Sequence, residues 1–484
     1  MENIFSRLNK QQSLSSMRCL ADIVSDKKRK ESESKGYFFG YTAKSWSKLF
    51  HGINPRYVYC TKADALPSEL YYLDKERYIC FPMQIYNGQI LDLTNSYQDT
   101  LRKMIQEKRA QYDARDYLRL LGPITSEQTG NIAMGVLRLM LENEEPNPSL
   151  YKAAIDTYSF CDCGAQELGV DALERLFLCK SDEQKAKTAA ALANYPEKIT
   201  VYRGEGSEST PYTEAYTWTT YIDTAYFFAG RRSSTGCKLC EGTVLREDVL
   251  EYIADRNETE IIVAPDKVSN VHVLPLFGLD EMLALTKPTM FDRKRQFPSI
   301  SFPANILSDT KALYETIHVE DHSVDHPLRV ALLASFLYRC EVLMPLLDKS
   351  NASYQDALPT YEALIAAAEY HDSGRWDNAP NDTHGAAGYA RYQQDHGNNE
   401  VVNFLCTFHC KADEDARAYW QAHFDGEDKE LVWTAFEIMK DADALDRVRF
   451  GRHCEDYLKV SFLHSDTSRK LVPAAMQLAL SALF

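Results

Sequence analysis

The spacing of apolar residues changes several times along the chain, and each change marks a new kind of element. Between Tyr37 and Ser96, β-branched and aromatic runs such as RYVYCT and RYICFPMQIY are bounded by turn residues, a pattern typical of strands. From residue 98 to 145 the apolar residues recur every three or four positions, as in DTLRKMIQEKRAQYDARDYLRLL, which predicts helices. We expect the helical pattern to continue to Asn194.

The second half of the chain begins with strands and ends with helices. Apolar runs predict strands from Ile199 to Leu276. Residues 292–303, DRKRQFPSISFP, are first charged and then contain two prolines, which predicts an exposed linker. Beyond it the pattern is almost wholly helical, most clearly in HPLRVALLASFLYRCEVLMPLL and ELVWTAFEIMKDADALDRVRF. The final run, LVPAAMQLALSALF, is too short to span a bilayer and predicts a core helix.

Together these segments predict an α+β protein of several domains, which a length of 484 residues also favours. Residues 1–35 contain the charged, Ser-rich run SDKKRKESESK and are expected to be loose or disordered. The expected parts after them are an N-terminal α/β region over residues 36–135, a β-rich domain with a helical lobe over 136–290, a linker over 291–305 and an all-α domain over 306–484.

Charge and cysteine content narrow the expected environment. The net charge of −16 disfavours binding to nucleic acid or to anionic membranes. The first residues, MENIFSRLNKQQSLSS, lack the apolar stretch of a secretory signal. The twelve cysteines are scattered, as expected of reduced thiols. These features predict a cytoplasmic protein without a membrane span, and passage into a host cell through a specialised secretion system stays open.

Three short segments in the strand-rich part carry residues suited to chemistry on a dinucleotide. ITVYRGEG puts Arg203 at the end of an apolar strand, and YTWTT puts Thr217 and Thr219 on a second one. NETEIIVAP puts Glu258 and Glu260 just before a third strand. Residues two apart on a strand share a face, so both carboxylates are expected to point into one cleft.

Such residues match the demands of cleaving the bond between nicotinamide and ribose. The sugar develops positive charge, which a nearby carboxylate can stabilise. The guanidinium of Arg203 can grip a pyrophosphate through charge-assisted hydrogen bonds. A second carboxylate can take a proton from the acceptor.

In this order, the three segments resemble the arginine–serine–glutamate class of NAD-dependent ADP-ribosyltransferases. The resemblance implies NAD as a substrate and a protein side chain, arginine favoured, as the acceptor. Thr217-Trp218-Thr219 stands where the family has Ser-x-Ser. Taken alone, Phe227 and its aromatic neighbours are more typical of core residues. The resemblance implies NAD binding by Arg203, Gly204, Thr217, Thr219 and Phe227, catalysis by Glu260, and activation of the acceptor by Glu258.

The C-terminal part is rich in histidine and aspartate. All histidines except His51 and His272 lie from His318 onward. Mixed imidazole and carboxylate ligands suit a divalent metal such as Mn, Fe, Mg or Zn. The candidates are His322 and His326 four residues apart, the pair His371-Asp372, His384, His409, and Asp441 and Asp443 in the run DAD.

The order of these residues resembles the HD phosphohydrolase superfamily. The resemblance implies that His322 protonates the leaving group. Of the two aspartates in the run DAD, Asp441 is expected to face solvent. The implied first-metal ligands are His326, His371, Asp372 and Asp443, and the implied further ligands are His384 and His409.

The two resemblances together suggest that the second site processes the product of the first. The SidE family of bacterial effectors pairs these activities to attach ubiquitin to serines, and this chain is similar in the pair of activities, with the transferase first. Ubiquitin is then a candidate protein substrate. That family is thought to use a histidine as a transient nucleophile, which would make His322 or His326 the nucleophile in place of a metal. The alternatives are an independent nucleotide phosphohydrolase and a binding module without catalysis.

Overall fold

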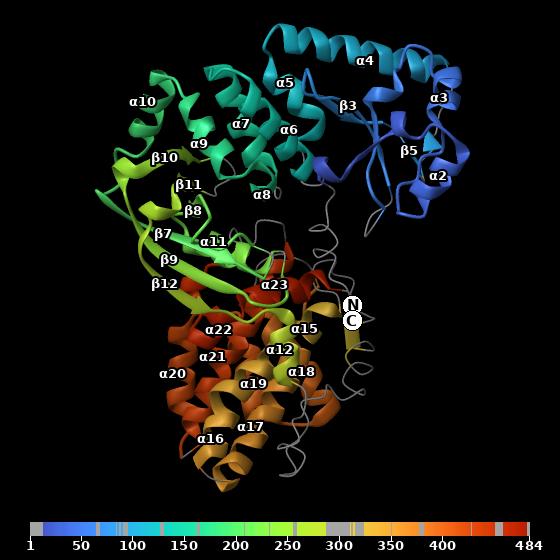
Figure 1. Ribbon diagram of the computed structural model, residues 1–484. Helices are drawn as coiled ribbons and strands as arrows, with labels where there is room; N and C mark the ends of the chain where they lie inside the picture. The colour runs from blue at the N-terminus through green and yellow to red at the C-terminus, as the bar shows by residue number, and fades with distance from the viewer. Residues whose placement is uncertain are drawn as a thin grey trace. The chain divides into compact units, whose positions relative to one another are not determined.

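The computed structural model divides into two compact units, Met1–Asn194 and Tyr195–Phe484 (Figure 1). Each unit contains its own sheet and helices, which makes the protein a mixed α+β protein with a helical C-terminal part. The structure describes residues 13–63, 68–83, 85–86, 89–90, 95–125, 130–161, 165–207, 209–231, 233–254, 259–286, 310, 313–314, 324–349, 351–376, 382–426, 428–450 and 458–481.

The first unit combines a small antiparallel sheet, in the strand order β1-β2-β3-β4, with helices. Its strands are β1 (Arg18–Cys19), β2 (Val58–Cys60), β3 (Leu70–Asp74), β4 (Ile79–Pro82), β5 (Ile85–Tyr86) and β6 (Gln89–Ile90). Its helices are α2 (Asp26–Glu33), α3 (Ala43–Leu49), α4 (Asn95–Asp113), α5 (Tyr117–Leu121), α6 (Gly130–Asn143), α7 (Pro148–Phe160), α8 (Ala165–Leu168), α9 (Val170–Leu178) and α10 (Asp182–Ala191).

The charged run near the N-terminus differs from the prediction that residues 1–35 are loose. It forms helix α2, which begins after Ser25, whose side chain accepts a hydrogen bond from the backbone N–H of Lys28. Arg29 and Glu33 form an ion pair of 2.8 Å one turn apart. Capping and ion pairs at this spacing stabilise a helix that has little apolar surface to bury.

The second unit contains the longer strands and the C-terminal helices. Its strands are β7 (Lys198–Glu205), β8 (Thr217–Thr219), β9 (Lys238–Leu245), β10 (Val249–Ile253), β11 (Glu260–Val263) and β12 (Ser269–Pro275). Its helices are α11 (Ile222–Gly230), α12 (Leu279–Thr286), α15 (Asp325–Tyr338), α16 (Met344–Lys349), α17 (Asn351–Tyr370), α18 (His384–His396), α19 (Glu400–Phe408), α20 (Asp413–His423), α21 (Lys429–Asp446), α22 (Asp466–Lys470) and α23 (Val472–Leu480).

The sheet of the second unit has the strand order β10-β11-β8-β7-β9-β12, and all neighbouring strands are antiparallel. Helix α11 packs closely on β7 (Figure 1). Gly204 makes this approach possible, because a Cβ atom there would lie 1.8 Å from the carbonyl oxygen of Ala225. The close packing of α11 on β7 therefore explains why residue 204 is a glycine.

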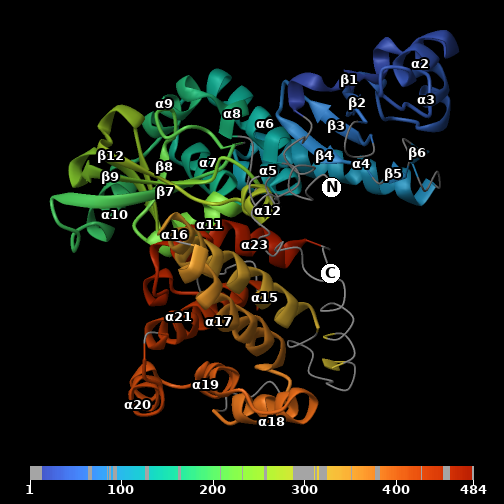
Figure 2. The same ribbon diagram turned by 90° about the horizontal axis from the view of Figure 1, so that it is seen from below.

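Helices α15, α17 and α21 pack against one another and form the centre of the helical part (Figure 2). Helix α19 contacts α17, α18 and α21, so it joins α18 to this centre. As predicted, the C-terminal apolar run forms a core helix, α23, which is buried along most of its length. Among the described helices, none combines the length and the apolar character needed to cross a membrane.

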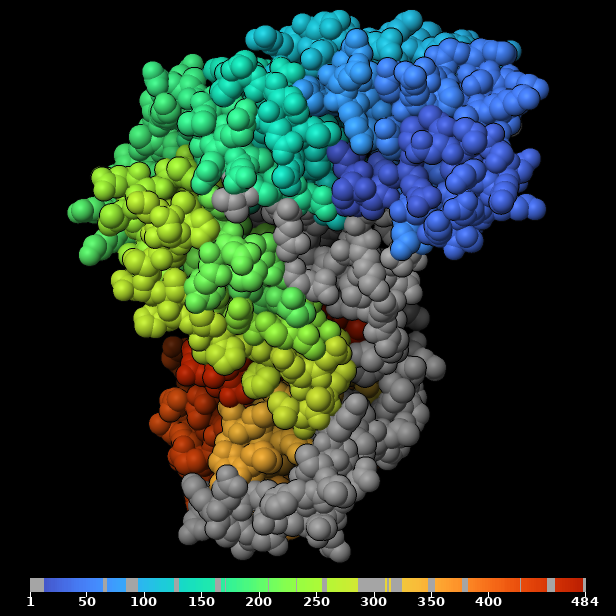
Figure 3. Space-filling view, in the orientation of Figure 1, coloured from blue at the N-terminus to red at the C-terminus, as the bar shows by residue number. Residues whose placement is uncertain are grey.

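The strand-rich part and the helical part share one hydrophobic core, where the sequence predicted separate domains over residues 136–290 and 306–484. Helix α23 contacts α11 and α12 on one side and α21 on the other, and the two parts abut in the space-filling view (Figure 3). Gln477 of α23 donates to the carbonyl oxygen of Gly230 at 2.8 Å and accepts from Leu279 N at 2.8 Å. The unit accordingly begins at Tyr195. The predicted linker over residues 291–305 lies outside the described residues.

Candidate functional site

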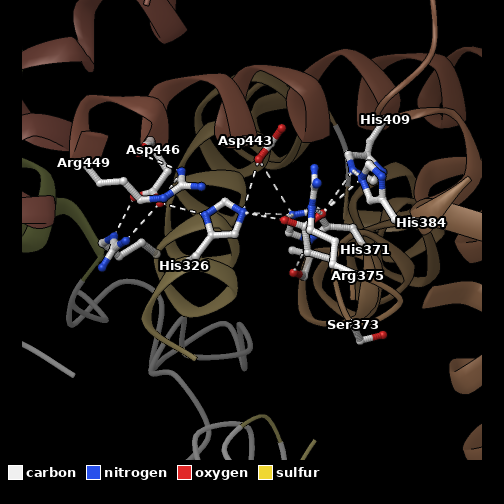
Figure 4. Close-up of polar contacts among 12 residues, drawn as sticks. His326, His371, Ser373, Arg375, His384, His409, Asp443, Asp446 and Arg449 are labelled. Carbon is white, nitrogen blue, oxygen red and sulfur yellow. Dashed lines mark hydrogen bonds and ion pairs between the residues drawn. The ribbon is translucent and has the colours of Figure 1, made fainter. Parts of the chain in front are cut away.

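Six of the residues predicted as metal ligands lie at or near helix ends, where the backbone brings them to one point. Figure 4 shows His326 and Asp443 on one side of His371, and His384 and His409 on the other. Their positions are the first turn of α15 for His326, the turn after α17 for His371 and Asp372, the start of α18 for His384, the residue after α19 for His409 and the last turn of α21 for Asp443.

The first half of this centre contains His326, His371, Asp372 and Asp443. The Nε2 atom of His326 lies 3.2 Å from Nε2 of His371 and 3.3 Å from Oδ2 of Asp372. The same atom lies 3.4 Å from Oδ1 of Asp443. Four ligand atoms therefore converge on one small volume, as the sequence predicted.

The second half uses the other oxygen of Asp372. Its Oδ1 atom lies 3.2 Å from Nε2 of His384 and 3.7 Å from Nε2 of His409. The two Nε2 atoms of His384 and His409 are 3.0 Å apart. The carboxylate of Asp372 thus lies between the two halves, with one oxygen toward each.

Hydrogen bonds hold the imidazole rings so that Nε2 faces the centre. Nδ1 of His371 donates to the carbonyl oxygen of Ala368 at 2.8 Å, and Nδ1 of His409 donates to that of Cys406 at 2.7 Å. Because a carbonyl oxygen only accepts, each of these rings carries a proton on Nδ1, and the neutral tautomer with that proton has its lone pair on Nε2. This is the tautomer that a metal ligand needs.

The centre brings imidazoles and carboxylates together in a buried place. His326, His371, Asp372 and His384 are almost fully buried. Burial and Arg449 lower the pKa of His326, but hydrogen bonds to Asp372, Asp443 and Asp446 outweigh them and raise it to about 10. Although burial opposes its charged form, contacts with His326 and His371 hold the pKa of Asp443 well below its ordinary value. Asp443 therefore lies where it stabilises positive charge, and the imidazole and carboxylate donors of the centre suit a divalent ion.

Asp446 is a part of the centre that the sequence analysis missed. Its Oδ2 atom lies 2.8 Å from Nδ1 of His326, and Arg329 binds both of its oxygens at 2.6 and 3.0 Å. Arg449 lies 3.2 Å from the same carboxylate. The spacing in the sequence could have revealed this pair. Arg329 and Asp446 each lie three residues after a predicted ligand, and residues at this spacing are neighbours on one face of a helix.

Asp446→Asn is expected to weaken divalent-ion binding by ~10–100-fold, because a carboxylate that orients a ligating histidine contributes about that much. Isothermal titration with Mn²⁺ or Zn²⁺ measures the change, and thermal unfolding of the metal-free protein shows whether the fold survives. The exposed Glu430, on the same helix, provides the control substitution Glu430→Gln. Equal affinity in wild type and Asp446→Asn would remove Asp446 from the centre.

Asp441 corrects one sequence prediction, since it is buried and does not face solvent. Its carboxylate accepts hydrogen bonds from the backbone N–H of His464 at 3.0 Å and of Ser465 at 3.3 Å. It also lies 2.6 Å from Nδ1 of His464. The segment around His464 covers this face of α21, a long-range contact that periodicity within one helix does not reveal.

The contact between His464 and Asp441 predicts a pH-dependent stability. The hydrogen bond to Asp441 outweighs burial and raises the pKa of His464 from 6.5 to about 9. A pKa raised in the folded state stabilises the protein fully below pH 6.5, and the contribution is lost as pH rises toward 9. The melting temperature of His464→Gln should therefore fall furthest below wild type near pH 6 and approach it near pH 9.5. The exposed His423 provides the control substitution His423→Gln. A difference in melting temperature between wild type and His464→Gln that stays the same from pH 6 to pH 9.5 would contradict the prediction.

The strand cluster, which consists of Arg203, Thr217, Thr219 and Glu260, lies on three neighbouring strands, β7, β8 and β11 (Figure 1). The guanidinium of Arg203 donates to the carbonyl oxygen of Thr217 at 2.8 Å and to its hydroxyl at 3.0 Å. It also pairs with the buried Glu205 at 2.9 Å. Glu260 pairs with Thr219 in the strand register. The structure thus brings Arg203 onto Thr217 by direct contact and Glu260 beside Thr219.

Other predicted NAD-binding residues have packing roles in this structure. Phe227 is buried in the core and Gly204 lies against α11. Glu258 and His322 lie outside the described residues.

Thr259, directly before Glu260, has a φ of 39°, which is strained for a β-branched residue and is typical of functional sites. Its hydroxyl accepts from Thr220 at 2.9 Å, a contact that the sequence analysis missed.

Comparisons of the chain with known proteins identify no relative. No protein-family model, no curated protein and no solved structure matches the chain. What can be said of function therefore depends on the two clusters and their chemistry.

Proposed function

We propose that the protein is a metal-dependent phosphohydrolase of the HD type, whose centre acts on a phosphodiester or a pyrophosphate. One observation carries the proposal, the position of the Asp372 carboxylate. Its two oxygens face different pairs of imidazoles, His326 and His371 on one side, and His384 and His409 on the other. A carboxylate shared in this way is suited to hold two divalent ions close together.

The residues of the centre have separable roles in such a reaction. Divalent ions held here would neutralise charge on the phosphate and make water a better nucleophile at neutral pH. Arg375 Nε donates to Asp372 Oδ1 at 2.9 Å and fixes the orientation of the shared carboxylate. Asp446 holds the ring of His326, and Arg329 balances the charge of Asp446.

The test uses the full-length protein with Mn²⁺, Fe²⁺, Mg²⁺ or Zn²⁺ and a panel of phosphodiesters, pyrophosphates and nucleoside monophosphates. We expect hydrolysis that a chelator stops and that added metal restores. Hydrolysis that continues in the chelator would favour a histidine nucleophile, with His322 or His326 as candidate. Metal binding without turnover of any compound would favour a binding module.

We propose an NAD-dependent protein ADP-ribosyltransferase as a second function, supported by the neighbouring strands that carry Arg203, Thr217 and Glu260. The contacts of Arg203 limit this proposal, because its guanidinium already donates to Thr217, Thr210 and Glu205. One donor N–H of the guanidinium is left for a ligand in this arrangement. A grip on the NAD pyrophosphate through two N–H groups of Arg203 would therefore require one of these partners to be exchanged.

If both reactions occur, the paired activity resembles that of the SidE effectors, with ubiquitin as one candidate substrate. The hydrolase would then cut the pyrophosphate of an ADP-ribosylated protein, releasing AMP and leaving phosphoribose. Labelled NAD, ubiquitin and the double variant His371→Ala/Asp372→Ala separate the possibilities. Coupling predicts that the double variant accumulates intact ADP-ribosylated protein. The same uncut product from wild type would mean that the phosphohydrolase acts on an unrelated nucleotide.

A further inference from the structure

Cys410 lies beside the second half of the metal centre, and no sequence motif pointed to it. One ligand atom from each of Cys410, His384 and His409 can be chosen so that all three lie within 4.8 Å of one another. Cys410 directly follows His409, in the turn after α19. A thiol at this place adds a third kind of donor atom to a centre otherwise built from nitrogen and oxygen.

The donor atoms of this half are spaced as a tetrahedral ion requires. Oδ1 of Asp372 and Nε2 of His384 are 3.2 Å apart, and the Nε2 atoms of His384 and His409 are 3.0 Å apart. The third separation, from Asp372 to His409, is 3.7 Å. Ligands at about 2.0–2.1 Å from a tetrahedral zinc ion lie about 3.3 Å from one another. The three atoms fit three corners, and the Cys410 thiol, within 4.8 Å of ligand atoms of His384 and His409, is the candidate for the fourth.

The two halves of the centre differ in chemical softness. Among the described residues, the first half contains His326, His371 and Asp443 beside Asp372, so its donors are imidazole and carboxylate groups. Such donors suit Mn, Fe or Mg as well as Zn. A thiolate is a softer ligand, and it favours zinc over Mg²⁺ and Mn²⁺.

We propose that Cys410 is a thiolate ligand that makes the second half of the centre zinc-selective, together with Asp372, His384 and His409. The inference rests on the proposed function in one respect, namely that the centre binds metal. It goes further in assigning different ion preferences to the two halves. Asp372 can serve both, because Oδ1 has two lone pairs and Arg375 uses one of them.

Cys410 is partly exposed and also lines a surface cavity of about 360 Å³. The other lining residues include Lys411 and the carboxylates of Asp382 and Asp415. A ligand at the edge of a cavity can be oxidised or alkylated when the ion leaves. Bound zinc should therefore protect this thiol.

The test measures metal binding by the full-length protein and not its activity alone. Wild type loaded with Co²⁺ should show a thiolate-to-cobalt charge-transfer band in the near ultraviolet, and Cys410→Ser and Cys410→Ala should lose it. In both variants, the affinity of one of the two sites for zinc should fall by ~10²-fold or more. This loss is larger than the one typical of a residue that only orients a ligand. Iodoacetamide should label Cys410 more slowly in the zinc-loaded than in the metal-free wild type.

Cys340→Ala is the matched control, because Cys340 is partly buried like Cys410 but lies in the helical turn Arg339–Leu343, apart from the residues of the metal centre. It should keep the band, and circular dichroism of the metal-free variants should equal that of wild type. An unchanged band and zinc affinity in both Cys410 variants would overturn the inference while leaving the metal centre intact. A wild type that binds no metal would overturn both this inference and the proposed phosphohydrolase.

Discussion

Asp372→Asn is expected to lower the rate of phosphate hydrolysis by ~10³-fold or more, because a bound metal contributes several kcal/mol to such reactions and each 1.4 kcal/mol is tenfold. The substitution keeps the shape of the side chain but removes the charge that the two halves share. Asp372 is almost fully buried and contacts His326, His384 and Arg375. Few other single changes would affect both halves at once.

The rate and the metal content of Asp372→Asn should fall together. Asp395→Asn is the matched control, because Asp395 is exposed and its contact with the Tyr370 hydroxyl lies outside the centre. Thermal unfolding of the metal-free proteins reports whether the fold is kept. A variant that loses its metal but keeps the rate of wild type would show that the ions are not needed for hydrolysis.

Glu260→Ala is expected to lower transfer of ADP-ribose from NAD by ~10²–10³-fold, the usual loss when one preorganised electrostatic stabiliser is removed. Glu260 begins β11, beside Thr219 of β8, and is partly exposed. The strained Thr259 precedes it. Release of labelled nicotinamide and labelling of protein measure the two parts of the reaction separately.

Glu241→Ala is the control for this prediction, since Glu241 is an exposed carboxylate on β9 of the same sheet. If Glu258 activates the acceptor, Glu258→Gln should spare NAD hydrolysis and lose protein labelling. Transfer by Glu260→Ala at the rate of wild type would remove the strand cluster from consideration as a transferase site.

The sequence was sufficient to predict which residues gather at the candidate metal centre, but not the contacts that hold them in place. The order and spacing of His326, His371-Asp372 and Asp443 predicted one group, and the structure brings them within hydrogen-bonding distance. The ring orientations depend on backbone carbonyls, such as that of Ala368, which no motif encodes. Cys410 was also invisible, because a lone cysteine beside a histidine is common.

Long-range packing explains the other differences. Asp441 lies two residues before Asp443 on α21, so the two side chains point to different faces of that helix. Whether the face that carries Asp441 meets solvent or His464 depends on a segment 23 residues later in the chain. The core shared by α11, α12 and α23 has the same origin, because each helix alone shows only that one of its faces is apolar.

The most direct test of the account is the metal content of the full-length protein after reconstitution and removal of excess ion. Inductively coupled plasma mass spectrometry gives the number of ions per chain, measured in parallel with the rate of phosphate hydrolysis. We predict two bound ions per wild-type chain, a loss of ions and rate together in Asp372→Asn, and recovery of rate when a chelated sample is reloaded. A wild-type chain that holds no ion, and whose rate is unchanged by chelation, would contradict the central claim.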